Sequence, residues 1–453
     1  MQLPSSLITS LHGIKGFNQK AFQAIHTSGE QVTSIRNNPL KTINGNCQPS
    51  TVNRQPIAWC PYGYYLPQRP SFTLDPTFHA GAYYVQEASS MFLWHILQQT
   101  IGTNTKGLKV LDLCAAPGGK STLLASYFSD GLVISNDVIK SRANILVENI
   151  TKWGYENVVV TNNDPSHFKI LENYFDVIMV DAPCSGSGLF RKDTNAINEW
   201  SEANVALCSQ RQQRITADVL PALKQGGLLI YSTCSYSKQE DEDILDWLVA
   251  AQDLASVNCQ PSTNFGIVET QSDKHKAFGY RFYPYLTQGE GFFVGAFTKK
   301  NGGLTGNYKQ QLLAKPSKLE TDMVVDFMGL RNTDSLFKQH EEIRLLPTQW
   351  WEDLQILAKH LYIKKAGIAI GAVKGKDIIP HHELAVSIVP LPNMPTIALS
   401  ETEALQYLRR KELVVEAVKG WAAVTFCALR LGWIKVLPNR INNYYPQEWR
   451  ILK

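Results

Sequence analysis

The 453-residue sequence lacks the features that mark exported, membrane-spanning and zinc-ribbon proteins. Its first ten residues contain neither a basic segment nor an apolar core. The longest largely apolar run, Trp421–Leu429, is far shorter than the roughly 20 residues that a membrane helix needs. The eight cysteines form no CxxC pair, which argues against a zinc ribbon and a disulfide framework. We therefore expect a cytoplasmic protein with reduced thiols, no metal and no membrane partner.

The sequence also has no large excess of positive or negative charge. Lys and Arg number 44, Asp and Glu number 40, and the net charge of +4 is too small to indicate a nucleic-acid partner by itself. Basic residues nevertheless outnumber acidic ones in residues 301–453 and not in residues 1–300. With 44% hydrophobic and 19% charged residues the chain can build real cores, and its length predicts about three domains.

Short apolar runs alternate with helical stretches from residue 106 onward, with strands expected near residues 110–114, 132–137, 157–161, 175–181 and 227–234. This alternation is typical of a parallel sheet covered by helices on both faces. Two later runs, Tyr280–Leu286 and Gly291–Phe297, predict an antiparallel hairpin that closes the sheet. The acidic run Glu240–Asp243 is expected to form the first turn of a helix, favoured by the helix dipole.

These patterns divide the chain into four parts. We predict an N-terminal helical extension at residues 1–105 and a Rossmann-like α/β domain at residues 106–300. A Gly-rich linker follows at residues 301–320. Residues 321–453 then form a small β-rich region of one or two modules.

A Gly-rich turn follows the first expected strand and reads Cys114-Ala-Ala-Pro-Gly-Gly-Lys120. It matches neither the dinucleotide pattern GxGxxG nor the P-loop pattern GxxxxGK[ST], which disfavours NAD and ATP. Acids stand at or just after the ends of the next three strands: Asp137, Asp164 and Asp181. Ligands of such sheets lie beyond the carboxyl ends of the strands, so the pattern indicates a nucleoside without a pyrophosphate, of which S-adenosylmethionine is the obvious example.

Two thiols are expected at the same edge of the sheet. The fourth strand leads to Asp181-Ala-Pro-Cys184, and the fifth leads to Ser232-Thr-Cys234-Ser235. A redox pair is one alternative, but nothing else near these residues supports it. The cofactor expected beside the two thiols points away from redox chemistry.

These motifs, in this order and spacing, resemble the RNA cytosine-5 methyltransferases of the Sun/Fmu type. Two upstream segments, Ser34–Pro39 and Phe78–Met91, resemble that family too, and Gly432–Lys435 with Asn439–Pro446 is similar to the bacterial RsmF-like ribosomal RNA enzymes. The resemblance implies a Rossmann-like S-adenosylmethionine-dependent methyltransferase with a PUA-like C-terminal region.

The resemblance also implies roles for individual residues. Cys234 would be the nucleophile and Cys184 would assist release, while Asp181 and Lys120 would act on the cytosine or on the thiol. The expected cofactor-binding residues are Cys114, Ala115, Ala116, Pro117, Gly118, Gly119, Lys120, Asp137, Arg142, Asp164 and Asp181.

The expected partner is RNA, and the resemblance favours small-subunit ribosomal RNA, with the protein acting as a monomer. A duplex buries its cytosines, so the enzyme needs an exposed base and a surface that binds the RNA backbone. The basic C-terminal residues are the candidates for this surface: Lys364, Lys365, Lys374, Lys376, Arg409, Arg410 and Lys411. A transfer RNA substrate stays open, and a non-catalytic RNA-binding protein is disfavoured because neither the loop nor a cysteine is lost. An amino-group methyltransferase would need Pro-Pro-Tyr where this chain has Ala-Pro-Cys.

Overall fold

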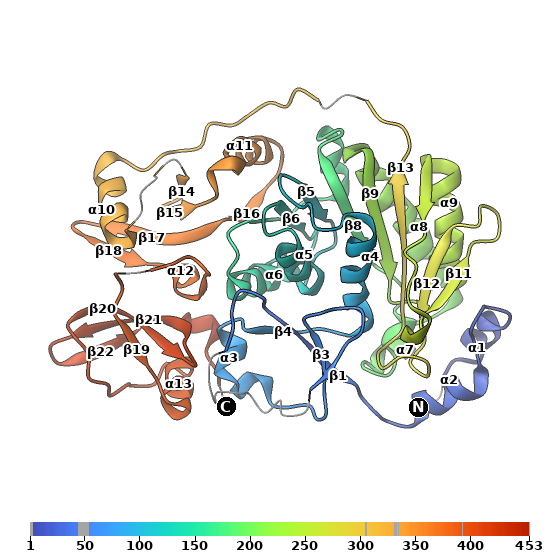
Figure 1. The fold of residues 1–453 in the computed structure, drawn as a ribbon, viewed down its shortest axis with the longest axis horizontal. Helices are drawn as coiled ribbons and strands as arrows, with labels where there is room; N and C mark the ends of the chain where they lie inside the picture. Colours follow the sequence, from blue (N-terminus) through green and yellow to red (C-terminus); the bar gives the residue numbers. More distant parts are fainter. Residues whose placement is uncertain are drawn as a thin grey trace.

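A ten-stranded mixed sheet forms the centre of the protein (Figure 1). The computed structural model describes residues 3–43, 54–303, 306–329, 333, 335–391 and 393–452, so Cys47 and part of the predicted linker lie outside the described residues. The strand order is β11-β12-β13-β9-β8-β5-β6-β7-β16, and β10 pairs with β13. Neighbours from β9 to β7 are parallel, and all other pairs are antiparallel.

The strands of this sheet are β5 (Lys109–Asp112), β6 (Leu132–Asn136), β7 (Val158–Thr161), β8 (Phe175–Asp181), β9 (Leu223–Thr233), β10 (Leu254–Val257), β11 (Val268–Gln271), β12 (Phe278–Phe282), β13 (Phe292–Lys299) and β16 (Ile363–Ala366). The predicted hairpin is confirmed, because β12 and β13 pair in antiparallel register with Tyr280 opposite Val294.

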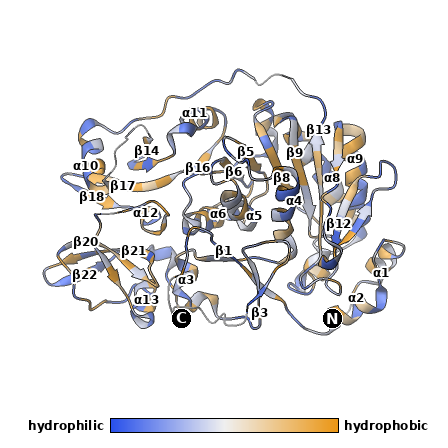
Figure 2. Ribbon diagram, viewed as in Figure 1, coloured by the Kyte–Doolittle hydropathy of each residue, from blue (hydrophilic) through white to orange (hydrophobic). Residues whose placement is uncertain are grey.

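Successive residues of the parallel strands point to opposite faces of the sheet, and both faces are buried. Val110 and Val133 pack into one core, and Leu111 and Ile134 pack into the other. Apolar residues that line both faces explain why these strands read as continuous hydrophobic runs (Figure 2). The first core is covered by α4 (Phe92–Thr100), α5 (Gly119–Tyr127) and α6 (Lys140–Trp153); the second is covered by α8 (Glu202–Val219), α9 (Glu242–Gln252) and α11 (Trp351–His360).

The central sheet is not confined to residues 106–300 as predicted. Strand β16, from the C-terminal region, pairs antiparallel with β7, and α11 contributes Leu354 and Leu357 to the second core. Sequence patterning missed this strand because Ile363–Ala366 contains two lysines and reads as part of a separate module.

The N-terminal extension is not purely helical. Helices α1 (Ser5–Leu11) and α2 (Gln19–Thr27) precede a four-stranded antiparallel sheet with the order β2-β3-β1-β4. The strands are only two to five residues long, which is too short for a clear alternation pattern. They are β1 (Thr33–Asn37), β2 (Gln55–Pro56), β3 (Gly63–Leu66) and β4 (Tyr83–Val85), and the short helix α3 (Pro76–His79) precedes β4.

The C-terminal region contains two small four-stranded sheets, in agreement with the one or two modules predicted. The first comprises β14 (Leu336–Gln339), β15 (Glu342–Leu345), β17 (Ile368–Lys374) and β18 (Asp377–Pro380). The second comprises β19 (Thr396–Ala398), β20 (Gly420–Phe426), β21 (Leu429–Leu437) and β22 (Arg440–Asn443). The remaining helices are α7 (Asn195–Glu199), α10 (Lys318–Met328), α12 (His382–Val386) and α13 (Glu401–Leu408).

The N-terminal sheet and the last module share one hydrophobic core. Ile35 and Tyr83 of the extension pack in the same cluster as Tyr407 and Val424. Lys41 Nζ also donates to three backbone carbonyls from three parts of the chain, those of Ala80, Lys152 and Val386. The two ends of the chain therefore stabilise each other.

Cys60, Cys114, Cys184, Cys208, Cys234 and Cys259 are free thiols. The expectation of reduced thiols throughout is wrong for Cys427, which is disulfide-bonded. None of the helices in the described part of the chain has the length and apolar content needed to span a bilayer.

Candidate active site

The Gly-rich turn lies where the sequence predicts it, between β5 and α5. Gly118 has a φ of +118°, a left-handed conformation that favours glycine, and it stands immediately before α5. Residues of β6 and α6 hold the turn in place through hydrogen bonds. Ala115 N donates to Asn136 O at 2.7 Å, Arg142 Nη2 donates to Ala116 O at 2.5 Å, and Asn149 Nδ2 donates to Pro117 O at 2.8 Å.

Asp137 supports the same turn. Its carboxylate accepts from the Ala116 amide at 3.3 Å and from the Ile139 amide at 2.9 Å, and Arg142 Nη2 lies 3.8 Å away. Asp164 lies differently. Its carboxylate accepts from the amide and hydroxyl of Ser166 and thereby caps a 3-10 helix, and it is not among the residues that line the cavity described below.

A cavity of about 330 Å³ opens beside the turn. It is large enough for a nucleoside-sized ligand. Cys114–Pro117, Gly119, Lys120, Arg142, Asp181 and Cys234 line it, as the sequence predicts for a common site. The other lining residues are Tyr84, Val85, Gln86, Glu87, Ser90, Asp112, Leu189, Glu290, Gly291 and Phe292.

Sequence patterns missed two groups of lining residues, a segment of the N-terminal extension and a pair of buried acids. The segment Tyr84–Glu87 comes from the N-terminal extension, where only the family resemblance drew attention to it. Asp112 and Glu290 are acids whose burial no local pattern reveals. Burial raises the pKa of Asp112 to about 7 although Ser121 donates to it at 2.7 Å, and burial also raises the pKa of Glu290 to about 7.

The cavity fits S-adenosylmethionine. Asp112 Oδ1 is buried with no hydrogen-bond partner among the described residues, so it can accept from a bound polar group. Acids at the wall, namely Asp112, Asp181 and Glu290, suit the positive sulfonium, and the turn with its small residues lets a ligand approach the backbone closely.

The two predicted thiols meet at this cavity. Cys184 Sγ lies 3.0 Å from Cys234 Sγ, although 49 residues separate them in the sequence. Parallel strands β8 and β9 end side by side, with Asp181 opposite Ser232, and this register brings the two loops together. Of the two cysteines, Cys234 lines the cavity.

A charged pair stands next to the thiols. Lys120 Nζ lies 2.8 Å from Asp181 Oδ2, and Ser232 Oγ donates to Asp181 Oδ1 at 2.5 Å. Burial by itself would lower the pKa of Lys120, but the adjacent Asp181 leaves that pKa above its usual value. Lys120 therefore carries a full positive charge at the cavity wall.

The environment distinguishes the two thiols. The hydrogen bond with Cys234 and then burial raise the pKa of Cys184 well above its usual value. Cys184 therefore keeps its proton and can donate it to the Cys234 sulfur. Position also distinguishes them, because Cys234 lines the cavity where a base could bind.

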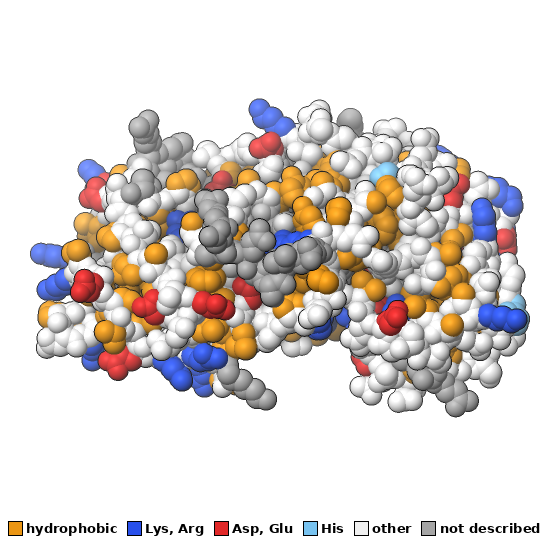
Figure 3. Space-filling model, turned by 60° about the horizontal axis from the view of Figure 1, so that its bottom comes forward, with side chains coloured by type: hydrophobic (Ala, Val, Ile, Leu, Met, Phe, Trp, Pro, Cys, Tyr) orange, Lys and Arg blue, Asp and Glu red, His pale blue; other side chains and the backbone are white. Residues whose placement is uncertain are grey.

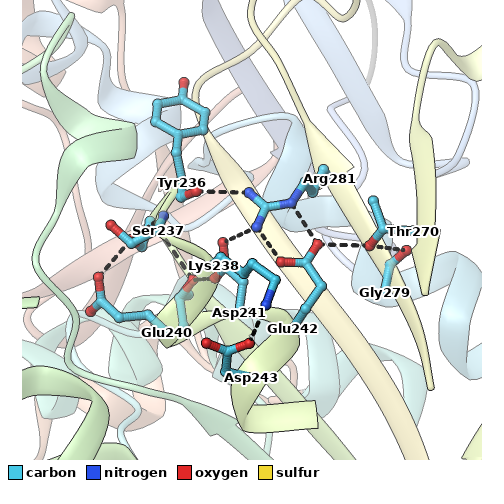
Figure 4. Close-up of polar contacts among 12 residues, drawn as sticks. Tyr236, Ser237, Lys238, Glu240, Asp241, Glu242, Asp243, Thr270, Gly279 and Arg281 are labelled. Carbon is cyan, nitrogen blue, oxygen red and sulfur yellow. Dashed lines mark hydrogen bonds and ion pairs between the residues drawn. The ribbon is translucent and has the colours of Figure 1, made fainter. Parts of the chain in front are cut away.

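The acidic run after β9 begins a helix as predicted, with Glu242 and Asp243 in the first turn of α9, but most of the run is buried and not exposed to solvent. Glu240 and Asp241 are 0% exposed, Glu242 is 4% exposed, and Ser237 makes no side-chain cap (Figure 4). Arg281 on β12 explains the discrepancy for two of the acids. Its Nη2 lies 3.0 Å from Asp241 Oδ2, and its Nε donates to Glu242 Oε1 at 2.7 Å.

The prediction that Lys365 binds RNA is wrong. Lys365 is 1% exposed, and its Nζ lies 2.8 Å from Glu383 Oε2, so it cannot contact phosphate. Lys374, Lys376, Arg410 and Lys411 are exposed. Figure 3 shows basic and acidic side chains interspersed over the end of the molecule that the C-terminal modules form. Within the described residues, no group of three or more His, Cys, Asp or Glu side chains could hold a metal ion.

Three family models match the chain. The model for 16S rRNA methyltransferase RsmB/F matches residues 101–298, that for the N-terminal domain of 16S rRNA methyltransferase RsmF matches residues 3–88, and that for the methyltransferase RsmF PUA domain matches residues 394–451. Together with the sheet and the cavity, they define a Rossmann-like S-adenosylmethionine-dependent methyltransferase with a C-terminal PUA domain.

Relatives agree over most of the length. Ribosomal RNA small subunit methyltransferase F of Shewanella piezotolerans is 30% identical over 92% of this chain and 90% of its own. The protein of the same name from Escherichia coli O157:H7 is 28% identical over 92% and 89%. The chain belongs to the ribosomal RNA small subunit methyltransferase F family.

Solved structures show the same fold. A methyltransferase homolog protein from Pyrococcus horikoshii is 27% identical with a TM-score of 0.51, over 66% of this chain and all of that one. NSun6 from Pyrococcus horikoshii, solved with the S-adenosylmethionine analogue SFG, is 17% identical with a TM-score of 0.53, over 66% of this chain and 98% of that one.

Proposed function

We propose that the protein transfers a methyl group from S-adenosylmethionine to carbon 5 of a cytosine in RNA, and that the RNA is small-subunit ribosomal RNA. One observation carries the cytosine chemistry: two cysteines from neighbouring strand ends lie 3.0 Å apart at the cofactor cavity. Transfer to an amino group has no use for a thiol, whereas carbon 5 needs one. Membership of the family supports the choice of RNA.

Cys234 is the nucleophile in this proposal. Its thiolate adds to carbon 6 of the ring, and the electron pair that moves to carbon 5 makes that carbon reactive. Bound S-adenosylmethionine supplies the methyl group that carbon 5 attacks. Loss of the carbon 5 proton to a base then expels the Cys234 thiolate and restores the aromatic ring, and Cys184 assists this release.

Asp181 and Lys120 orient the cytosine. Lys120 and Ser232 fix the Asp181 carboxylate at the cavity wall, so that it can accept from the amino group or the protonated ring nitrogen of the base. A protonated ring accepts the thiolate more readily. Lys120 and Cys234 line the same cavity, so the positive charge of Lys120 lies on the side from which a base meets the sulfur.

The cofactor is held by the turn Cys114–Lys120 and by Asp137, Asp164 and Asp181. Asp137 is assigned to the ribose hydroxyls and Asp164 to the adenine. Arg142 acts by holding the turn through Ala116. Asp112 is added to this set, because it lines the cavity and its Oδ1 has no hydrogen-bond partner among the described residues.

The domain roles follow from the same reasoning. Residues 106–300 carry the catalytic side chains, on a sheet that β16 and α11 complete. Residues 1–105 and the other parts of residues 321–453, beyond the linker 301–320, bind RNA. The exposed basic residues of the C-terminal modules contact phosphate, and this part of the site makes affinity depend on salt.

Bisulfite sequencing of total RNA from a strain that lacks the gene tests the proposal. One cytosine of small-subunit ribosomal RNA should lose its methylation, and wild-type protein but not Cys234→Ala should restore it. Loss of methylation in a transfer RNA instead would move the substrate to that class. Unchanged cytosine methylation in all RNA would contradict the proposed chemistry.

A further inference from the structure

One acid of the run after β9 contacts both cysteine loops. Glu240 Oε1 accepts from Ser185 N at 2.8 Å and from Gln212 Nε2 at 3.0 Å. Glu240 Oε2 accepts from Ser185 Oγ at 2.5 Å and from Ser235 Oγ at 2.6 Å. The carboxylate is fully buried, and each of its oxygens receives two donors.

Two of these donors are the residues that follow the two cysteines in the sequence. Ser185 follows Cys184 directly, and Ser235 follows Cys234 directly. We propose that Glu240 is a positioning residue that joins the two cysteine loops, so that the Cys184 and Cys234 sulfurs stay in contact at the cavity. This inference rests on the proposed function of the two cysteines.

The backbone that carries Glu240 is itself fixed. Thr233 Oγ1 donates to Asp241 Oδ1 at 2.7 Å, and Tyr231 OH donates to Glu240 O at 2.7 Å, so the end of β9 is bonded to the same acidic turn. Arg281 binds that turn from β12 through Asp241 and through the Tyr236 carbonyl, at 3.0 Å each (Figure 4). Thr233 and Ser235, the residues on either side of Cys234, thus donate hydrogen bonds to the consecutive acids Asp241 and Glu240.

Charge sets Glu240 apart from its neighbours. Arg281 pairs with Asp241 and Glu242, and Lys238 pairs with Asp243. Among the described residues no Lys, Arg or His lies within ion-pair distance of Glu240, whose buried charge is met only by neutral donors. A leucine or alanine would fold more cheaply at a purely structural position, because a buried charge without a cation is costly. The carboxylate is suited to binding hydroxyls and amides from two separate loops.

Thiol oxidation measures the proximity of the two sulfurs directly. With diamide, the Cys184 and Cys234 thiols lose two protons and two electrons to form a disulfide, and diamide is reduced to the hydrazine. The rate of the Cys184–Cys234 peptide link, followed by mass spectrometry after digestion, reports how well the loops are held. Glu240→Ala should slow this closure by about tenfold or more, because small displacements of reacting groups are costly.

A matched control lies on α9, the helix that follows Glu240 in the chain. Asp246 is 7% exposed and accepts from the backbone amides of Lys274 and His275, with no contact to either cysteine loop. Asp246→Asn should lower the melting temperature and leave the closure rate unchanged. Equal closure in Glu240→Ala, Asp246→Asn and the wild type would overturn the proposal.

Two more variants keep the test decisive if Glu240→Ala does not fold. Ser235→Ala removes only the bond from the Cys234 loop and should slow closure in a folded protein. Glu240→Gln keeps the shape and removes the charge that helps to raise the pKa of Cys184. Under conditions in which both variants are folded by circular dichroism, iodoacetamide should then modify Cys184 at lower pH in Glu240→Gln than in Asp246→Asn. Closure and modification like those of the wild type in both variants would refute the assignment.

The kinetics of methyl transfer give a second test of the proposal. Glu240→Gln should lower kcat by on the order of 10²-fold at unchanged cofactor affinity, because the amide NH2 cannot accept the donors that one carboxylate oxygen binds, and the cysteine loops are held less well while the cofactor turn is untouched. If Glu240→Ala slows closure but the wild-type protein makes no 5-methylcytosine, the role of Glu240 is supported and the proposed function is refuted. Normal closure with normal kcat would refute the role of Glu240 alone.

Discussion

Ending the chain at Lys300 should unfold the catalytic domain, although every predicted catalytic and cofactor-binding residue would be retained. The sequence alone favours the opposite outcome, since the Gly-rich linker suggests an independent module beyond it. In the structure, residues after the linker complete the second core of the central sheet. These residues are Phe337, Leu346, Trp350, Leu354, Ile356, Leu357, Leu361 and Ala366.

The magnitude follows from burial. Each large apolar side chain contributes about 1.5–3 kcal/mol when it is fully buried, so losing the aromatic and aliphatic members of this set removes on the order of 10 kcal/mol. That is comparable to the whole stability of a typical protein, about 5–15 kcal/mol. Truncation also removes β16 from the edge of β7 and Asp353, which accepts from Tyr174 OH at 2.5 Å and pairs with Lys109 at 2.9 Å.

Urea unfolding, size exclusion and calorimetry with S-adenosylmethionine measure the result. Residues 1–300 alone should aggregate or unfold without cooperativity and bind no cofactor. A full-length protein with a protease site near the exposed Leu312 is the control, because a nick there leaves both cores complete. The cleaved pieces should stay associated and bind the cofactor. A monomeric, cooperatively unfolding 1–300 fragment with full cofactor affinity would refute this reasoning.

Three further predictions concern single side chains. Cys234→Ala should abolish methyl transfer without changing cofactor affinity, whereas Cys184→Ala should accumulate a covalent RNA adduct on denaturing gels; an adduct only in Cys234→Ala would reverse the two roles. Asp137→Ala should weaken cofactor binding by about 1–3 kcal/mol in titration calorimetry, because the ribose and the Ala116 amide of the turn lose their acceptor, and an unchanged dissociation constant would count against its place at the ribose. Burial lowers the pKa of His26 from 6.5 to about 4, so the unfolded chain binds a proton that the folded chain does not between these values, and stability must fall as pH drops through this window. In urea titrations at several pH values, His26→Gln should reduce that slope by up to about 1.4 kcal/mol per pH unit, and an identical slope would show that His26 is not buried as a neutral group.

The parts of the site that the sequence predicts share one physical origin. Parallel strands end at one edge of a sheet, so the residues that follow β5, β8 and β9 must lie together, whatever their separation along the chain. The turn before Lys120, the acid Asp181 and the two cysteines all belong to this set, and the structure brings them together.

The parts that the sequence misses depend on tertiary packing. Glu240 and Asp241 have the spacing and composition of a solvated helix start, and nothing local reveals that Ser185 from one loop and Arg281 from another strand enclose them. Lys365 likewise reads as a surface charge until Glu383 is seen beside it. Whether a charged side chain is buried depends on the residues that enclose it. When those residues are distant in sequence, they leave no periodic signal.

The N-terminal sheet connects the cofactor turn to the PUA domain. Arg36 on β1 donates from Nη2 to Thr122 Oγ1 at 2.6 Å and from Nε to Gln86 Oε1 at 2.8 Å, and so it contacts both α5 and a residue of the cavity wall. The neighbouring residue Ile35 points the other way, into the core that this sheet shares with Tyr407. Alternation along a single strand therefore places the cofactor cavity and the PUA domain on opposite faces of the same few residues. Because both contacts are buried and specific, the position of the C-terminal domain relative to the cavity is fixed by packing and does not depend on the linker that joins them in sequence.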